Sequence, residues 1–156
     1  MFSRLGSLLS NASADAPGKP LGDHATILIV DDSATMRAVV GKPLRSLGYK
    51  TLEADSGITG LGEWDSHKDE IAMIISDIYM PGMDGLTFVK HVRKRTTKLP
   101  IALMSSRIND DSAWVAEEAG FRCLQKPFSD EQLFELVREM IGSPPSAPSA
   151  QPLTQA

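Results

Sequence analysis

The sequence has 156 residues, 42% of them hydrophobic and 23% charged, with a formal net charge of -4 at pH 7. This composition suits one globular domain with a packed core, and the negative charge argues against an electrostatic footprint for nucleic acid or an anionic membrane. No run is long and apolar enough to span a bilayer, so stable membrane insertion is not expected. The only cysteine, Cys123, excludes an intramolecular disulfide and fits a protein of the reducing cytoplasm.

The two ends of the chain differ in composition from its middle. Residues 1–24 predict a flexible N-terminal extension, either a frayed tail or a short helix that docks on a partner or a membrane surface. Residues 143–156 are rich in Pro, Ser and Ala and predict a disordered tail or a linker. We therefore expect one folded domain over residues 25–142.

Within this domain, short apolar runs alternate with stretches of helical spacing. Strands are expected at Thr26–Val30, Lys50–Ala54, Ile71–Ser76, Ile101–Met104 and Arg122–Gln125. Helices are expected from an N-cap at Ser33 to near Leu47, and at Ile58–His67, Gly85–Arg95, Asp110–Ala119 and Ser129–Ile141. This alternation predicts an α/β fold with a doubly wound parallel sheet, and the wholly apolar first and third strands belong in its middle.

Three local features qualify the expected helices and turns. Met36, Val39, Val40 and Leu44 share one face of the first helix, and Pro43 predicts a kink in it. The run MPGMDG after the third strand predicts a turn in which glycines supply backbone freedom. Ser129 and Gln132 have the spacing of a capping box at the start of the last helix.

Polar side chains stand where the strands end. Asp31 and Asp32 follow the first strand, Asp77 follows the third, Ser105 follows the fourth and Lys126 follows the fifth. Because ligands bind beyond the carboxyl ends of parallel strands, we expect these side chains to lie together in one site.

The chemistry of this set points to phosphoryl transfer. Clustered carboxylates repel one another unless a cation lies among them, and oxygen ligands of this kind suit Mg²⁺. A carboxylate can also attack phosphorus and form an aspartyl phosphate. The cation, a lysine and a hydroxyl can then each contact one peripheral oxygen of the phosphoryl group.

The chain resembles the receiver domains of two-component response regulators, most closely the single-domain chemotaxis type, in four segments: ILIVDDSATMR, SDIYMPGMDG, LPIALMSS and CLQKPF. The resemblance covers roughly residues 25–141. It implies a flavodoxin-like fold with five helices and a five-stranded parallel sheet of order 2-1-3-4-5.

The resemblance also implies roles for the residues at the strand ends. Asp77 corresponds to the phosphoacceptor. Asp31 and Asp32 correspond to the acidic pair that holds Mg²⁺, together with Asp77 and the backbone carbonyl of Tyr79.

Ser105 corresponds to the switch hydroxyl, although a shift of one residue would give that place to Ser106. Lys126 corresponds to the family's lysine, and its bond to Pro127 is expected to be cis. Cys123 departs from the family, which usually has an aromatic residue there that couples phosphorylation to the output face. Cys123 cannot make the same swing as that aromatic residue, so the hydroxyl half of the usual switch, Ser105, is the part expected to remain.

These roles predict a signalling module that is not a turnover enzyme. Its expected partners are a histidine kinase or phosphotransfer protein and an effector protein, the latter on the face formed by the fourth helix, the fifth strand and the fifth helix. No nucleic acid is expected to bind this chain. We expect it to act either as a stand-alone regulator or as the N-terminal receiver of a larger one.

Two other functions fit the residues after the first strand less well. A phosphatase of the haloacid dehalogenase type needs an acid two residues after the first aspartate, where this chain has Ser33. A flavin-binding flavodoxin-like domain needs a hydroxyl- and glycine-rich phosphate loop after the first strand, where this chain has acids that repel phosphate.

Overall fold

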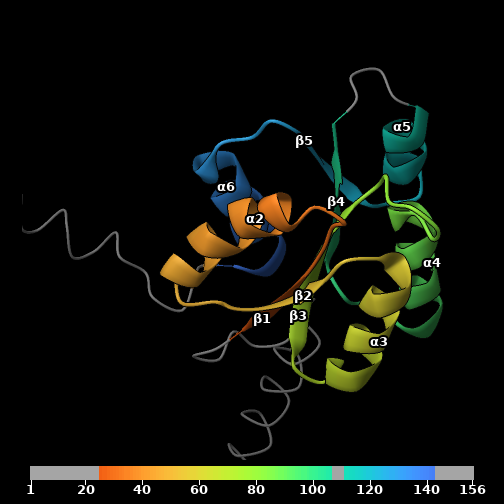
Figure 1. The fold of residues 1–156 in the computed structure, drawn as a ribbon, viewed down its shortest axis with the longest axis horizontal. Helices are drawn as coiled ribbons and strands as arrows, with labels where there is room; N and C mark the ends of the chain where they lie inside the picture. The colour runs from red at the N-terminus through yellow and green to blue at the C-terminus, as the bar shows by residue number, and fades with distance from the viewer. Residues whose placement is uncertain (1–24, 107–110, 143–156) are drawn as a thin grey trace, which may run out of the picture.

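The computed structural model describes residues 25–106 and 111–142 (Figure 1). The two predicted extensions, residues 1–24 and 143–156, lie outside this part, so their expected flexibility stays a prediction. Among the described residues, no helix has the length and apolar character needed to cross a membrane.

One parallel sheet forms the centre of the domain, with the strands in the order β2-β1-β3-β4-β5. The strands are β1 (Thr26–Val30), β2 (Lys50–Ala54), β3 (Ile71–Asp77), β4 (Ile101–Ser105) and β5 (Arg122–Gln125). Every residue of β1 and β3 is buried, whereas the edge strands β2 and β5 are partly exposed. The predicted fold class and strand order are confirmed.

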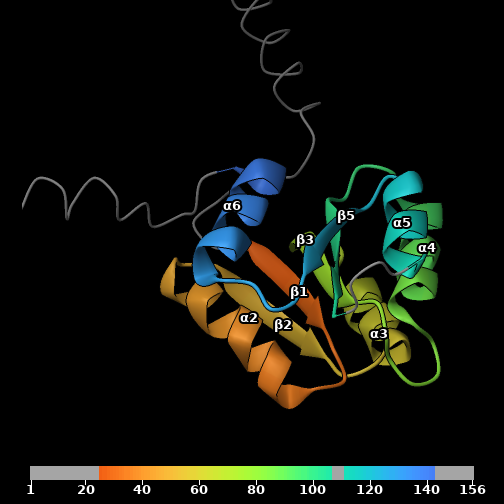
Figure 2. The same ribbon diagram turned by 90° about the horizontal axis from the view of Figure 1, so that it is seen from above.

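Five helices cover the two faces of the sheet: α2 (Ala34–Ser46), α3 (Gly57–His67), α4 (Gly85–Arg95), α5 (Asp111–Glu118) and α6 (Asp130–Ile141). Figure 2 shows α2 and α6 on one face and α3, α4 and α5 on the other. Because successive side chains of a strand point to opposite faces, β1 supplies Ile27 and Ile29 to the core under α2 and α6, and Leu28 and Val30 to the other core.

The helices begin where side chains can cap them. The Ser33 hydroxyl accepts a hydrogen bond from the backbone N–H of Met36, and Ser129 forms the predicted capping box with Gln132. α2 continues through Pro43 to Ser46, so the kink stays a prediction.

The predicted apolar face of α2 is wrong at one position. Val40 and Leu44 are buried, but Val39 is 42% exposed because the helix turns it away from the sheet.

Two glycines in the connection from β3 to α4 have different reasons to be there. Gly82 has a φ of 75°, so the predicted backbone freedom is confirmed. For Gly85 that explanation is wrong, because its φ is not positive. A Cβ at Gly85 would lie 1.8 Å from the carbonyl oxygen of Asp77, so glycine lets α4 begin directly against the end of β3.

Replacing Gly85 by alanine should therefore displace the end of β3. We expect Gly85→Ala to lower the free energy of unfolding by about 2 kcal/mol or more, the usual cost of forcing atoms into a packed region. Gly62→Ala is the matched control, because a Cβ there meets nothing within 4 Å. It should raise stability by about 0.5–1 kcal/mol through helix propensity. Urea unfolding measures both, and an unchanged midpoint for Gly85→Ala would contradict the steric account.

Candidate functional site

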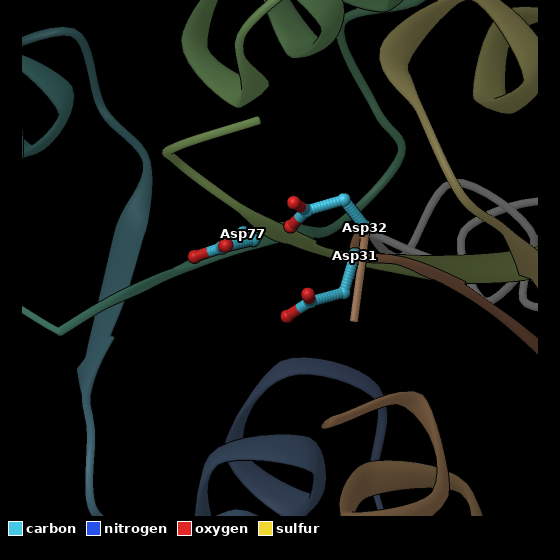
Figure 3. Close-up of side chains that lie close together, drawn as sticks. All are labelled: Asp31, Asp32 and Asp77. Atoms are coloured by element: carbon cyan, nitrogen blue, oxygen red, sulfur yellow. The ribbon is translucent and has the colours of Figure 1, made fainter. Parts of the chain in front are cut away.

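Three carboxylates meet at the carboxyl edge of the sheet. Asp31 and Asp32 follow β1 and Asp77 ends β3, and one carboxylate oxygen from each lies within 4.8 Å of the others. Figure 3 shows the three side chains beside one another. Asp31 and Asp77 are buried, at 1% and 6% exposure, whereas Asp32 is exposed. The cluster therefore opens to solvent on the side of Asp32.

Asp31 is fixed through all of its polar groups. Its backbone N–H donates to the carbonyl of Ala54 (3.1 Å), which ties the end of β1 to β2. Its Oδ1 accepts from the N–H of Ser33 (2.9 Å), and its Oδ2 accepts from Nζ of Lys126 (3.2 Å). Its carbonyl oxygen accepts from Nη1 of Arg37 (2.7 Å).

Lys126 directly follows β5, the last strand at one side of the sheet, and its side chain reaches the cluster from there. Its Nζ lies 3.2 Å from Oδ2 of Asp31 and 3.3 Å from Oδ1 of Asp77, and its side chain is largely buried. Its backbone N–H donates to the carbonyl of Ser105 (2.7 Å), and the expected cis bond to Pro127 is confirmed. One lysine thus contacts two carboxylates of a group of three.

Burial and the neighbouring charges together determine the pKa of Asp77. Burial is the largest influence and raises the pKa of this carboxyl; Lys126 lowers it, and the charges of Asp31 and Asp32 raise it again. The net pKa is raised, so the lysine compensates only part of the cost of ionising Asp77.

These residues fit a hard divalent cation. The cluster offers carboxylate oxygens from three residues, and Mg²⁺ is usually bound by one or two carboxylates together with water and phosphate oxygens. A divalent charge among them would offset the effects that raise the pKa of Asp77. Tyr79, whose carbonyl is the fourth predicted ligand, lies two residues beyond β3 in the same connection.

The predicted hydroxyl lies on the neighbouring strand. Ser105 is the last residue of β4 and is buried, while Ser106 is exposed. β4 pairs with β3 so that Met104 lies opposite Asp77, which places Ser105 at the same edge as the carboxylates. The five predicted side chains therefore all lie at this edge, and their chemical roles remain predictions.

Sequence reasoning missed Arg37 as a residue that shapes the site, and it gave Gly85, which also shapes the site, the wrong role. Gly85 allows α4 to start against Asp77, as described above. Arg37 contacts both the carbonyl of Asp31 and the carboxylate of Glu53. Glu53 lies 16 residues after Arg37 in the chain, on β2, where it is paired in register with Ile29 of β1. No local pattern shows such a contact, because it depends on the pairing of β1 with β2.

Comparison with known proteins gives a consistent family. The profile of the response regulator receiver domain matches residues 27–138. The chemotaxis protein CheY1 of Helicobacter pylori is 34% identical over 121 residues, which cover 75% of this chain and 97% of that protein. A structure of the chemotaxis protein CheY4 of Vibrio cholerae superposes with a TM-score of 0.69 at 30% identity, covering 76% of this chain and 99% of that one.

A longer relative contains the same unit. The sensor histidine kinase CheAY of Helicobacter pylori is 36% identical over 137 residues, but the match covers only 17% of that protein. The chain thus matches both a protein of similar length and a small part of a much longer one. The profile match and the coverage of CheY1 place the chain in the response regulator receiver domain family, as a CheY-like receiver of two-component signalling.

Proposed function

We propose that Asp77 accepts a phosphoryl group, in the presence of Mg²⁺, from a phosphohistidine on a histidine kinase or phosphotransfer protein. The observation that carries this proposal is the group of three carboxylates with Lys126 beside it. The kinase as partner is supported by the relative CheAY, whose name describes a sensor histidine kinase.

Asp77 suits the role of nucleophile better than Asp31 does. Both side-chain oxygens of Asp31 accept hydrogen bonds from the protein. In the described part of the chain, the carboxylate of Asp77 has one ion-pair partner, Lys126, at Oδ1. Its other oxygen can therefore attack without breaking a contact of the fold.

The transfer forms one bond and breaks one. An oxygen of Asp77 attacks phosphorus, the P–N bond to the histidine breaks, and its electron pair stays on the imidazole nitrogen. Lys126 already lies beside the acceptor and can contact one phosphoryl oxygen, and Ser105 offers a hydroxyl from the adjacent strand. Asp31, Asp32, Asp77 and the carbonyl of Tyr79 would hold Mg²⁺, which would supply countercharge to the phosphoryl oxygens.

We propose that the chain acts as a switch and not as a turnover enzyme. The product stays bound covalently to Asp77, and water removes the phosphoryl group slowly. A change of a few kcal/mol between two conformations is enough for such a switch to alter partner affinity.

We place the effector surface on α5, β5 and α6. Trp114 is 64% exposed on α5, although tryptophan is usually well buried. Asp111, Glu117 and Glu118 stand three or four residues from it along the helix, so they lie on its side. This surface suits a protein segment that offers an apolar contact and basic side chains, and it is unsuited to nucleic acid.

Cys123 connects this surface to the site in place of the aromatic residue that is usual in the family. The side chain is half-buried on β5, and its Sγ lies 3.7 Å from the carbonyl of Ala113 on α5. β5 pairs with β4 up to Ser105. Movement at Ser105 can therefore reach α5 through β5 without an aromatic side chain.

Replacing the proposed acceptor tests the chemistry. Asp77→Asn should abolish labelling by acetyl phosphate, because an amide oxygen does not form the acyl phosphate, and chelating Mg²⁺ should abolish labelling of the wild type. Intact-protein mass spectrometry measures the added phosphoryl group. Asp65→Asn, which removes an exposed carboxylate on α3, is the control and should label normally. Persistent labelling of Asp77→Asn would refute the assignment.

The readout can be followed through the two tryptophans of the chain. We expect beryllofluoride with Mg²⁺, a phosphoryl mimic, to shift the indole N–H signal of Trp114 in an NMR spectrum. The signal of Trp64, which is buried between α3 and the sheet, serves as the internal reference. If the indole signal of Trp64 shifts and that of Trp114 does not, the effector surface does not include α5.

A further inference from the structure

Arg37 on α2 is held from two sides. Its Nη1 donates to the carbonyl oxygen of Asp31 (2.7 Å), and its Nε donates to Oε1 of Glu53 (3.0 Å). The side chain is only 18% exposed, so water competes weakly for these charge-assisted bonds. The guanidinium therefore joins the end of β1 to the edge strand β2.

The carbonyl that Arg37 contacts belongs to the peptide between Asp31 and Asp32. A peptide unit is planar, so holding this oxygen also sets the direction in which the chain enters Asp32. The side chain of Asp31 is separately held by Ser33 and Lys126. Across residues 25–106 and 111–142, the carboxylate of Asp32 accepts no hydrogen bond, so this peptide is what aims it at the cluster.

Glu53 in turn fixes the guanidinium. It lies on β2 opposite Ile29 of β1, and its second oxygen lies 3.8 Å from Nη1 of Arg45. Arg45 also donates to the Thr51 hydroxyl (2.8 Å) and does not contact Asp31. The chain thus contains two arginines on one helix that share a carboxylate, only one of which reaches the site.

We infer that Arg37 is a positioning residue that holds the Asp31–Asp32 peptide in the geometry that binds the divalent cation. This inference rests on the proposed function, since it concerns the same site. It assigns the affinity for Mg²⁺ partly to a residue that does not itself contact the ion. Residues that orient metal ligands usually change metal affinity by about 10–100-fold when they are removed.

The test is calorimetric titration of Mg²⁺ into the full chain and its variants, well below their melting temperatures. Arg37→Ala should weaken binding about ten-fold or more. Arg37→Lys should fall between it and the wild type, because an ammonium lacks the planar fork that reaches both acceptors. Arg45→Ala removes the other cation of Glu53 and should bind Mg²⁺ within two-fold of the wild type. The backbone amide signal of Asp32 should move in Arg37→Ala and stay in Arg45→Ala.

The outcomes separate this inference from the proposal beneath it. Failure of the wild type to bind Mg²⁺ would remove the proposed function. Binding by the wild type with equal affinity in Arg37→Ala would leave that function in place and overturn the role of Arg37. An equal loss of Mg²⁺ affinity in Arg37→Ala and Arg45→Ala would also overturn the role of Arg37. The contacts that both arginines make with Glu53 on β2 would then explain the effect without the contact to Asp31. If Arg37→Ala does not fold, Arg37→Lys against Arg45→Lys gives the same comparison.

Discussion

Repulsion among three carboxylates, with one lysine to offset it, is the constraint on which the rest of this domain depends. Asp31, Asp32 and Asp77 lie within 4.8 Å of one another, and Lys126 contacts two of them. Burial and the neighbouring charges leave the pKa of Asp77 raised. The fold thus holds together a group of charges that favours the arrival of a cation and, with it, a phosphoryl group.

The scaffold withstands this repulsion because the strands that carry the acids are buried along their whole length. β1 and β3 lie side by side in the middle of the sheet with no exposed residue. Lys126 follows the edge strand β5 and lies 95 residues from Asp31 in the chain. Gly85 lets α4 begin against Asp77, and Arg37 ties the end of β1 to β2. Lys126 acts on the side chains of the acids, whereas Gly85 and Arg37 act on their backbone.

Much of this arrangement could be predicted from sequence, because it follows from local patterns. The apolar runs predicted the strands to within a residue, and the position of polar residues at strand ends predicted the site. Three features could not be predicted, since they depend on packing. The exposure of Val39 depends on how α2 lies on the sheet. The need for glycine at position 85 depends on the path of β3, and the contacts of Arg37 depend on strand register.

The most direct test of the charge imbalance compares the unfolding free energy of the wild type and Asp77→Asn against pH. A raised pKa in the folded state means that Asp77 favours folding when protonated, and that this contribution is lost as the pH rises through the folded-state pKa. Without divalent cations, Asp77→Asn should therefore be the more stable protein at pH 7, with the difference shrinking in acid. Mg²⁺ at ten times its dissociation constant should stabilise the wild type by about 1.4 kcal/mol and the variant by less. A wild type that is more stable than Asp77→Asn at pH 7 without Mg²⁺ would contradict the account.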